Sequence, residues 1–277
     1  MPPVSLSAYG LDRRHFLALG AALSTTFATR WDACADVPQE RADLRQILQE
    51  HGVAGTFVLY DQAADRTTMV NGERAAQRYV PASTFKIANS IIALETGVVK
   101  DENEVIPYGG KPQPFKVWEK DMPMREAITA SNVPIYQELA RRIGPERYRE
   151  WLDRLQYGNR QIGSFVETFW LDGPLEISVV EQARFVAALA QKKLPVSVRT
   201  QDIVRSILRL EEKGGRVLYG KTGWRFSSSP QLGWWVGWVE RDAQAWAFAL
   251  NIDMASPEDA KKRIAIGRMM LDRLGIY

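Results

Sequence analysis

A hydroxyl and an amine stand three residues apart in the stretch Pro81-Ala82-Ser83-Thr84-Phe85-Lys86-Ile87. Pro81 ends any extended segment before it, and apolar residues then recur at helical spacing as far as Gly97. Ser83 is therefore expected in or just before the first turn of a helix. Residues three apart on a helix are neighbours, and the first-turn N–H groups lack an intrahelical acceptor. The stretch can thus supply a nucleophile, a base and an oxyanion site.

The same pattern has a second interpretation, which is an N-capping serine followed one turn later by a solvated lysine. Taken alone, Ser-x-x-Lys fits this interpretation more often than it marks a catalytic pair. Ser83 and Lys86 therefore need support from other parts of the chain.

The scarcity of histidine and cysteine limits the chemistry, because the chain contains only His15, His51 and Cys34 of these types. No cluster of His, Cys and carboxylate residues has the spacing of metal ligands, so we expect no metal site. A serine–histidine triad would need His51, which lies at the end of an expected helix. A lysine or a carboxylate is the expected base.

The bulk composition indicates one folding unit with an ordinary surface. The chain has 277 residues, 45% of them hydrophobic, which is enough for a sizeable core. Its 36 basic and 33 acidic residues give a formal charge of only +3 and are spread along the sequence. We therefore expect no nucleic-acid surface.

Residues 1–35 read as an export signal. Arg13 and Arg14 precede an apolar run at 18–28, and Ala33-Cys34-Ala35 offers a small-x-small cleavage site. The paired arginines resemble a twin-arginine signal, and the run is too short to span a bilayer, so no stable membrane anchor is expected. An uncleaved amphipathic helix and a lipidated Cys34 are weaker alternatives. We expect a periplasmic protein whose residues 36–277 form a single catalytic domain.

The remaining patterns predict strands at both ends of the chain and helices between them. A helix ending at Gly52 precedes strands at 53–61 and 67–70, joined as a hairpin meander that turns at Asn71-Gly72. The pattern is helical to about residue 213, with a capping box at 178–181 that opens a helix through Ala190. Strands at 217–222, 233–240 and 245–254 and a helix after Ser256 follow.

This order predicts an α/β fold of the α+β type. An antiparallel sheet is built from both chain termini and packed by helices, while the central residues form an all-helical lobe. Residues 233–239 are almost continuously apolar and should form a central strand. Ser83 should open into the cleft between sheet and lobe.

Three further motifs accompany Ser83 and Lys86: Ala130-Ser131-Asn132-Val133, Tyr157-Gly158-Asn159 and Gly220-Lys221-Thr222-Gly223-Trp224. In this order and spacing they strongly resemble the class D, or oxacillinase-type, serine β-lactamases of the penicillin-recognising serine enzymes. The resemblance covers nearly all of residues 40–277. It implies the β-lactamase/transpeptidase-like fold and a small-molecule β-lactam as substrate.

The resemblance also implies a role for each catalytic residue. Ser83 would attack the β-lactam carbonyl, and Lys86, carbamylated by carbon dioxide, would be the general base for acylation and deacylation. Ser131 would pass a proton to the β-lactam nitrogen with help from Lys221. Trp170 would donate a hydrogen bond to the carbamate. No other cofactor is implied.

The implied substrate contacts surround these residues. Backbone N–H groups of Ser83 and Trp224 would form the oxyanion hole, and Thr222 would hold the substrate carboxylate together with Arg263. Arg263 rests only on its helix position, so neighbouring Lys262 could be the residue that faces the cleft. Tyr157-Gly158-Asn159 would shape the cavity wall. The other expected substrate-binding residues are Val133, Leu171 and Gly223.

The function implied is hydrolysis of β-lactam antibiotics through a serine acyl-enzyme, which would give β-lactam resistance. A β-lactam-sensing receptor domain and a penicillin-binding D,D-peptidase are alternatives. Such sensors share Ser-x-x-Lys and Lys-Thr-Gly, the peptidases share the fold, and both would be acylated by a β-lactam without turning it over. The sequence leaves the substrate range open, and it fits a monomer or a homodimer.

Overall fold

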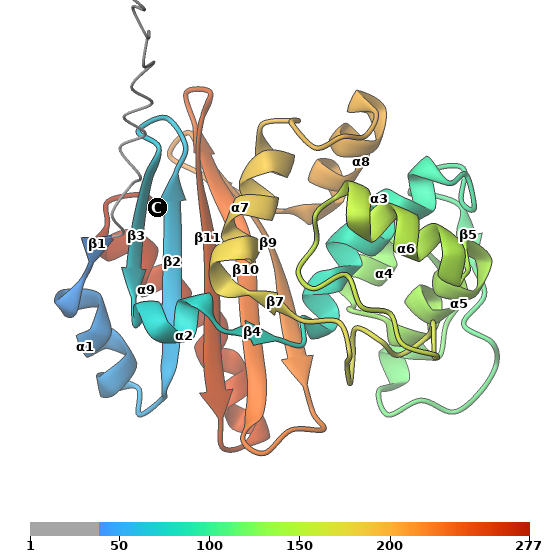
Figure 1. The fold of residues 1–277 in the computed structure, drawn as a ribbon, viewed down its shortest axis with the longest axis horizontal. Coiled ribbons are helices and arrows are strands. Elements are labelled where there is room, and N and C mark those ends of the chain that lie inside the picture. Colours follow the sequence, from blue (N-terminus) through green and yellow to red (C-terminus); the bar gives the residue numbers. More distant parts are fainter. Residues whose placement is uncertain (1–38) are drawn as a thin grey trace, which may run out of the picture. The chain divides into compact units, whose positions relative to one another are not determined.

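The computed structural model describes residues 39–277, and the expected export signal at 1–35 lies outside them. Seven strands form one sheet in the order β1-β3-β2-β11-β10-β9-β8 (Figure 1). Strands from the two ends of the described chain meet where β2 pairs antiparallel with β11. The bounds are β1 Gln39–Glu40, β2 Gly55–Asp61, β3 Arg66–Val70, β8 Arg209–Lys213, β9 Arg216–Arg225, β10 Gln231–Arg241 and β11 Gln244–Met254.

The sheet is antiparallel except for the short β1–β3 pair, as the short strand connections predicted. β10 lies between β9 and β11, and Gly233 to Val239 are all buried, which confirms the expected central strand. A strand covered on both faces needs apolar residues at successive positions.

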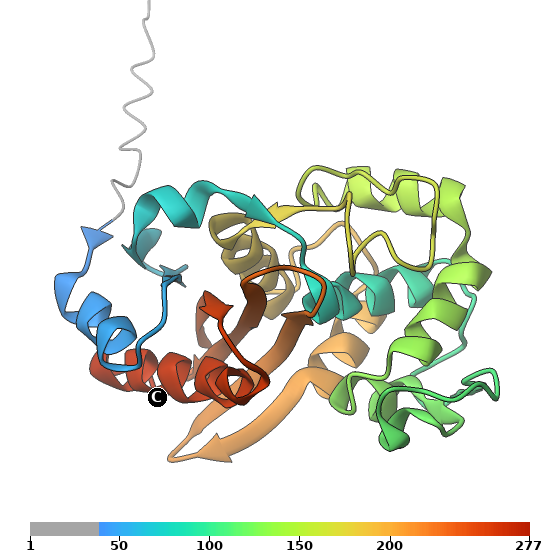
Figure 2. The same ribbon diagram turned by 90° about the horizontal axis from the view of Figure 1, so that it is seen from below.

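Helices cover both faces of the sheet (Figure 2). Helix α7 (Val179–Ala190) packs against β2, β10 and β11 on one face, while α9 (Lys262–Arg273) and α1 (Ala42–Glu50) pack together on the other. Two apolar cores result, one on each side. The capping box of Ser178 and Glu181 forms as predicted and fixes where α7 begins.

The middle of the chain forms the helical part beside the sheet (Figure 1). It begins with the 3₁₀ turn η1 (Ala82–Phe85), which runs directly into α3. The remaining bounds are α3 Lys86–Glu95, α4 Met124–Thr129, α5 Val133–Ile143, α6 Pro145–Arg154 and α8 Val198–Leu208; η2 Lys116–Trp118 and η3 Pro257–Lys261; and the two-residue strands β4 Arg78–Tyr79, β5 Val105–Ile106, β6 Met122–Pro123 and β7 Ile177–Ser178.

Two sequence expectations were wrong. Asn71-Gly72 does not continue a meander, because Asn71, at φ 58°, caps the short helix α2 (Gly72–Ala76) by accepting from the Arg74 N–H. Residues 209–213 are not helical but form the edge strand β8. Its side chains are mostly exposed, so it lacks the alternation of apolar and polar residues that identifies a strand.

Candidate active site

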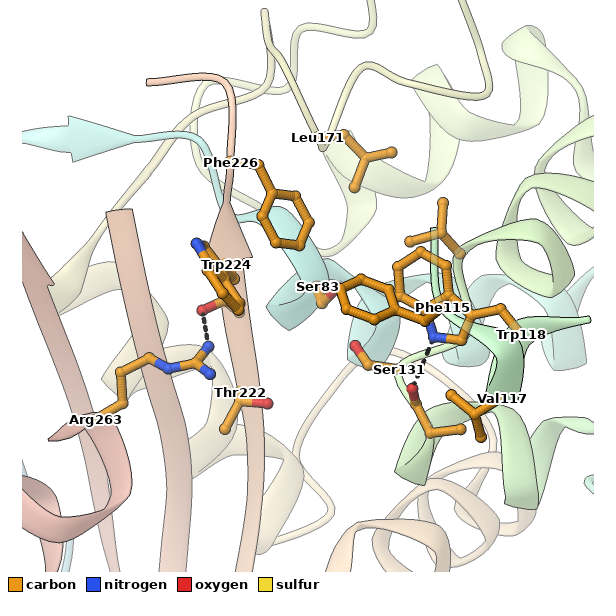
Figure 3. Close-up of a pocket in the computed structure, with 13 residues that line it drawn as sticks. Ser83, Phe115, Val117, Trp118, Ser131, Leu171, Thr222, Trp224, Phe226 and Arg263 are labelled. Carbon is orange, nitrogen blue, oxygen red and sulfur yellow. Dashed lines mark hydrogen bonds between the residues drawn. The ribbon is translucent and has the colours of Figure 1, made fainter. Parts of the chain in front are cut away.

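A cavity of about 210 Å³ lies where the helical part meets β9, and Ser83 opens into it (Figure 3). Ser83 comes from η1, Ser131 from the turn before α5, Thr222 from β9 and Arg263 from α9. Residues separated by up to 180 positions thus share one cleft, at the junction expected from the order of elements.

Ser83 and Lys86 form the closest chemical pair in the cleft. The Lys86 Nζ donates to the Ser83 Oγ at 2.8 Å, a distance suited to proton transfer. Ser83 reaches the cavity, whereas Lys86 is completely buried beneath it. The solvated lysine of the alternative interpretation is therefore ruled out.

The surroundings of Lys86 favour its neutral amine. Burial and, second, the nearby Lys221 cation hold the pKa of Lys86 well below its ordinary value. Within residues 39–277 no acidic side chain forms an ion pair with Lys86. The Tyr136 ring centroid lies 5.3 Å from Nζ, and the Tyr136 hydroxyl is held by Ser90 at 2.8 Å. Lys86 is thus prepared to accept a proton.

The turn that carries Ser83 is fixed from behind. Ala82 has φ 49°, a left-handed conformation that costs free energy in a residue with a Cβ. The Thr84 hydroxyl donates to the Pro81 carbonyl and accepts from the Gln182 amide of α7, each at 2.7 Å. The Phe85 ring is enclosed by four aromatic rings at 5.2–6.1 Å: Tyr148, Tyr157, Phe169 and Trp170. These contacts hold Ser83 in place directly after the strained backbone of Ala82.

Ser131 faces Ser83 from the helical side, and Lys221 lies next to it. The Lys221 Nζ donates to the Ser131 Oγ at 3.1 Å and to the Thr222 carbonyl at 2.9 Å. Burial and, second, the Arg263 cation lower the pKa of Lys221 to about 7. Lys221 can therefore gain or lose a proton near neutral pH, with Ser131 in hydrogen-bond contact.

The backbone around Ser131 is held by its neighbours. Ser131 has φ 52°, again a left-handed conformation. Asn132 caps α5 by accepting from the Ile135 N–H, and its amide donates to the Trp118 carbonyl at 3.2 Å. The Trp118 indole N–H in turn donates to the Ala130 carbonyl at 3.0 Å (Figure 3). The turn is thus tied to the loop that contains Trp118.

Arg263, and not Lys262, faces the cleft. Its guanidinium donates to the Gly223 carbonyl at 2.5 Å and lies 5.6 Å from the Trp224 ring centroid (Figure 3). Burial lowers the pKa of Arg263 to about 10, and among the described residues it has no acidic partner. Lys262 instead pairs with Asp259 at 2.8 Å and donates to the His51 carbonyl. Arg263 is a half-buried cation beside Thr222 with no acidic partner among the described residues, and such a group is suited to an anionic ligand.

Trp170 is fully buried against Phe85, the residue next to Lys86. Its indole N–H meets no hydrogen-bond acceptor anywhere in residues 39–277. An unsatisfied buried donor costs free energy, and in a native protein it calls for an explanation such as an unseen acceptor.

The comparisons with known proteins agree with one another. A model of the penicillin-binding-protein transpeptidase domain matches residues 55–272. β-Lactamase OXA-48 of Klebsiella pneumoniae is 40% identical over 92% of this chain and 96% of its own, and the probable β-lactamase YbxI of Bacillus subtilis (strain 168) is 39% identical over 72% and 74%. The crystal structure of FUS-1 (OXA-85), a class D β-lactamase from Fusobacterium nucleatum subsp. polymorphum, matches with 40% identity and a TM-score of 0.83, over 86% of this chain and 99% of that one. The chain belongs to the class D serine β-lactamases.

This class D β-lactamase has the fold expected from its sequence, with the predicted residues in two layers. Lys86, Trp170 and Lys221 are buried below the cavity surface. The other predicted residues line the cavity: Ser83, Ser131, Val133, Leu171, Thr222, Gly223, Trp224 and Arg263. The four residues expected to carry the chemistry, Ser83, Lys86, Ser131 and Lys221, are called the reaction centre.

One expected wall of the cavity is elsewhere. Tyr157 is buried and packs on Phe85 and Phe185, outside the lining of the class D site. Asn159 holds a neighbouring loop, because its side chain accepts from the Glu176 N–H and donates to the Pro174 carbonyl. The Tyr157-Gly158-Asn159 motif therefore supports the site from behind.

Sequence reasoning missed the outer wall of the cavity. Phe115 packs on Trp118 and Phe226, and Phe226 packs on Trp224 (Figure 3). The only available signal was the presence of aromatic residues in connections rich in Gly, Pro and Ser, where no core periodicity explains them. Phe115, Val117 and Phe226, together with Leu171, which the sequence analysis did predict, are called the mouth.

Between residues 39 and 277 there is no group of three or more His, Cys, Asp or Glu side chains that could hold a metal ion. Over the same residues, no helix has the length and apolar character needed to cross a membrane.

Proposed function

We propose that this class D β-lactamase hydrolyses β-lactams through an acyl-enzyme on Ser83, with Lys86 as the general base. The observation that carries the proposal is the 2.8 Å contact between Ser83 Oγ and a completely buried Lys86 amine. An ordinary lysine is protonated at neutral pH and cannot accept a proton, whereas burial and Lys221 lower the pKa of Lys86.

In acylation, the Ser83 Oγ bonds to the β-lactam carbonyl carbon while its proton passes to Lys86. Backbone N–H groups of Ser83 and Trp224 are proposed to stabilise the oxyanion. The ring C–N bond then breaks, the nitrogen takes a proton from Ser131, and the Lys221 cation returns a proton to Ser131 across their 3.1 Å contact. The proton that Lys86 took from Ser83 balances the one that Lys221 gives up. The product of this step is an ester on Ser83 with the ring opened.

In deacylation, water adds to the Ser83 ester and the C–O bond to Ser83 breaks, which restores the Ser83 hydroxyl. The residues around Lys86 fit a carbon dioxide adduct, because the amine is kept neutral and the Trp170 N–H meets no acceptor among the described residues. When bound, carbon dioxide supplies an anionic carbamate that can act as a base towards water. We propose that Trp170 donates to that anion.

The substrate carboxylate is proposed to lie between Thr222 and Arg263. Both residues line the cavity, and Arg263 has no acidic partner in residues 39–277. Val133, Leu171, Gly223 and Trp224 would contact the rest of the substrate. A guanidinium forms strong, directional hydrogen bonds with a carboxylate, so this contact would orient the ring carbonyl towards Ser83.

We also propose that residues 1–35 direct export to the periplasm, where 36–277 act as the mature catalytic domain and protect the cell from β-lactam antibiotics. The similarity to named β-lactamases supports this role. A monomer and a homodimer are both compatible with a site built from one chain.

Turnover distinguishes this function from a receptor or a D,D-peptidase that is acylated only once. Enzyme is incubated with a large excess of penicillin, and ring opening is followed past one equivalent. Continued hydrolysis is expected. A plateau at one equivalent would favour the alternatives.

Mass spectrometry of the intact protein tests the nucleophile. A slow penicillin should add one acyl group to the wild type and none to Ser83→Ala, which loses only a hydroxyl and should remain folded. Ser197→Ala, on the exposed start of α8, is the matched control and should still be acylated. An adduct on Ser83→Ala would refute the assignment.

A further inference from the structure

A second cavity, of about 180 Å³, lies beside Lys221 and Thr222. Its walls come from α4, α8, β8, β9, β10 and α9, and most of them are aliphatic or aromatic. The apolar side chains lining it are Ile128, Ile207, Leu208, Leu210, Trp235 and Ile264. No step of the proposed reaction uses this space.

The second cavity continues the first along β9. Thr222 lines both cavities. Thr129 and Ile264 line the second cavity, while their sequence neighbours Ala130 and Arg263 line the first. β8 pairs with β9 only as far as Tyr219, so the strand edge from Gly220 onward faces the cleft without a partner strand. A ligand held at Thr222 therefore has this cavity next to it.

The chemistry of the cavity suits a neutral apolar group. A dry cavity of about 150 Å³ lined by Leu, Ile and Phe can hold benzene, so this volume admits a short chain or a ring. A Cβ built at Gly220 would lie only 3.2 Å from the Leu210 side chain. Because Gly220 has no side chain, the part of the cavity next to Leu210 stays unfilled. Leu210 and Ile264 remain 50% and 38% exposed, and an occupant would cover them.

We propose that this second cavity is a substrate subsite, which takes the apolar substituent on the ring carbon next to the one that bears the carboxylate. The inference rests on the proposed function, since it requires the carboxylate at Thr222 and Arg263. In the proposed pose, a substituent on the adjacent carbon points along β9 towards Gly220, because Thr222 lines both cavities and Gly220 lines the second. The subsite would therefore select among cephem-type and penem-type β-lactams by that substituent.

A matched pair of cephems tests the proposal. Both carry the same 4-hydroxyphenylglycyl group at C7, and C3 bears either methyl or propenyl, neither of which is a leaving group. Each compound is used to inhibit hydrolysis of a reporter penicillin. Burial of two further carbon atoms should make the propenyl compound the stronger inhibitor by about 3- to 15-fold.

Variants assign that preference to the cavity. Leu210→Ala and Ile264→Ala should each reduce the preference to less than about 2-fold, because each removes one apolar wall. Val198→Ala, an exposed valine of α8 outside the cavity, is the control and should keep the full preference. Thermal unfolding of each variant checks that it is folded.

Three results would overturn the subsite. They are equal inhibition by the two cephems in the wild type, a preference that survives both wall variants, and a preference lost in Phe226→Ala but kept in Leu210→Ala. The last would place the substituent in the first cavity.

Failure of the subsite and failure of the proposed function can be told apart. If no acyl adduct forms on Ser83, the proposed function fails; if the adduct forms and the cephems inhibit equally, only the subsite fails.

Discussion

The reaction centre and the mouth lie in one cleft, yet they are built differently. Ser83, Lys86 and Lys221 are less than 10% exposed and sit on helices and strands whose neighbours fix them. The mouth residues Phe115 and Phe226 are 42% and 48% exposed and lie in connections. Positions held by buried elements suit chemistry, while exposed loop residues can vary with the substrate. Substitutions should therefore act on rate in the first region and on substrate preference in the second.

The largest effect is expected from Lys86→Met, which removes the base but keeps an apolar chain of similar length. Acylation should slow by at least about 10³-fold, the usual worth of a positioned general base. The folded protein should also become more stable, because the buried amine has no acidic partner among the described residues. Stopped-flow acylation and thermal unfolding measure the two effects. A variant that loses both activity and stability would show that Lys86 is mainly structural.

The next effect concerns pH and Lys221. The Lys221 pKa is about 7, so in the free enzyme this cation is lost as pH rises through 7. If the Lys221 cation attracts the substrate carboxylate and supports proton transfer by Ser131, kcat/KM should fall on the alkaline side of about pH 7. Lys221→Arg keeps a cation at higher pH, so the fall in kcat/KM should move to higher pH. The kcat/KM of this variant at its optimum should be about 10- to 100-fold lower than that of the wild type. An unchanged alkaline limb would exclude Lys221 as its source.

The sequence pattern located parts of the reaction centre, while the roles of its residues came from the resemblance to the class D enzymes. The helical pattern after Pro81 placed Ser83, and the apolar run at 233–239 placed the strand paired with Lys221-Thr222. Ser131, Trp170 and Arg263 were identified only through that resemblance. The rest of the mouth beyond Leu171 could not be predicted, because Phe115 and Phe226 are 111 positions apart and meet only through the fold.

The failures have similar physical causes. The exposed edge strand at 209–213 carries little hydrophobic periodicity, so nothing distinguished it from the end of a helix. Tyr157 was expected in the cavity because its motif resembles that of the family, but a buried aromatic cluster places it behind Phe85. Motif resemblance identifies a residue, whereas packing decides which way it faces.

Arg263→Ala tests the boundary between the two regions. The carboxylate contact is made in the ground state and the transition state alike, so KM should rise about 10- to 100-fold with a smaller change in kcat. Lys262→Ala is the matched control, since Lys262 points to Asp259 and His51. Steady-state kinetics with a penicillin give both constants. An effect of Lys262→Ala equal to that of Arg263→Ala would mean that general charge, and not contact, binds the substrate.

The smallest effect is expected at the mouth, from Phe226→Ala. The ring is half exposed and packs on the rings of Phe115 and Trp224, so its loss should change KM by about 2- to 5-fold. The size of the change should differ between substrates with small and large side chains, while the unfolding temperature stays constant. Kinetics with two penicillins of different side chains check this. A large fall in kcat with both would place the mouth in the reaction itself.

The proposed mechanism requires a neutral Lys86 amine for use as the base, with the Trp170 N–H as donor to a carbon dioxide adduct. The direct measurement is a ¹³C NMR spectrum of the enzyme equilibrated with ¹³C-labelled bicarbonate. We expect a carbamate resonance in the wild type, none in Lys86→Met, and a weaker one in Trp170→Phe, which keeps a ring but lacks the donor. Turnover lost at mildly acidic pH should return with added bicarbonate. No carbamate resonance in the wild type, with turnover insensitive to bicarbonate, would show that Lys86 works without a carbon dioxide adduct.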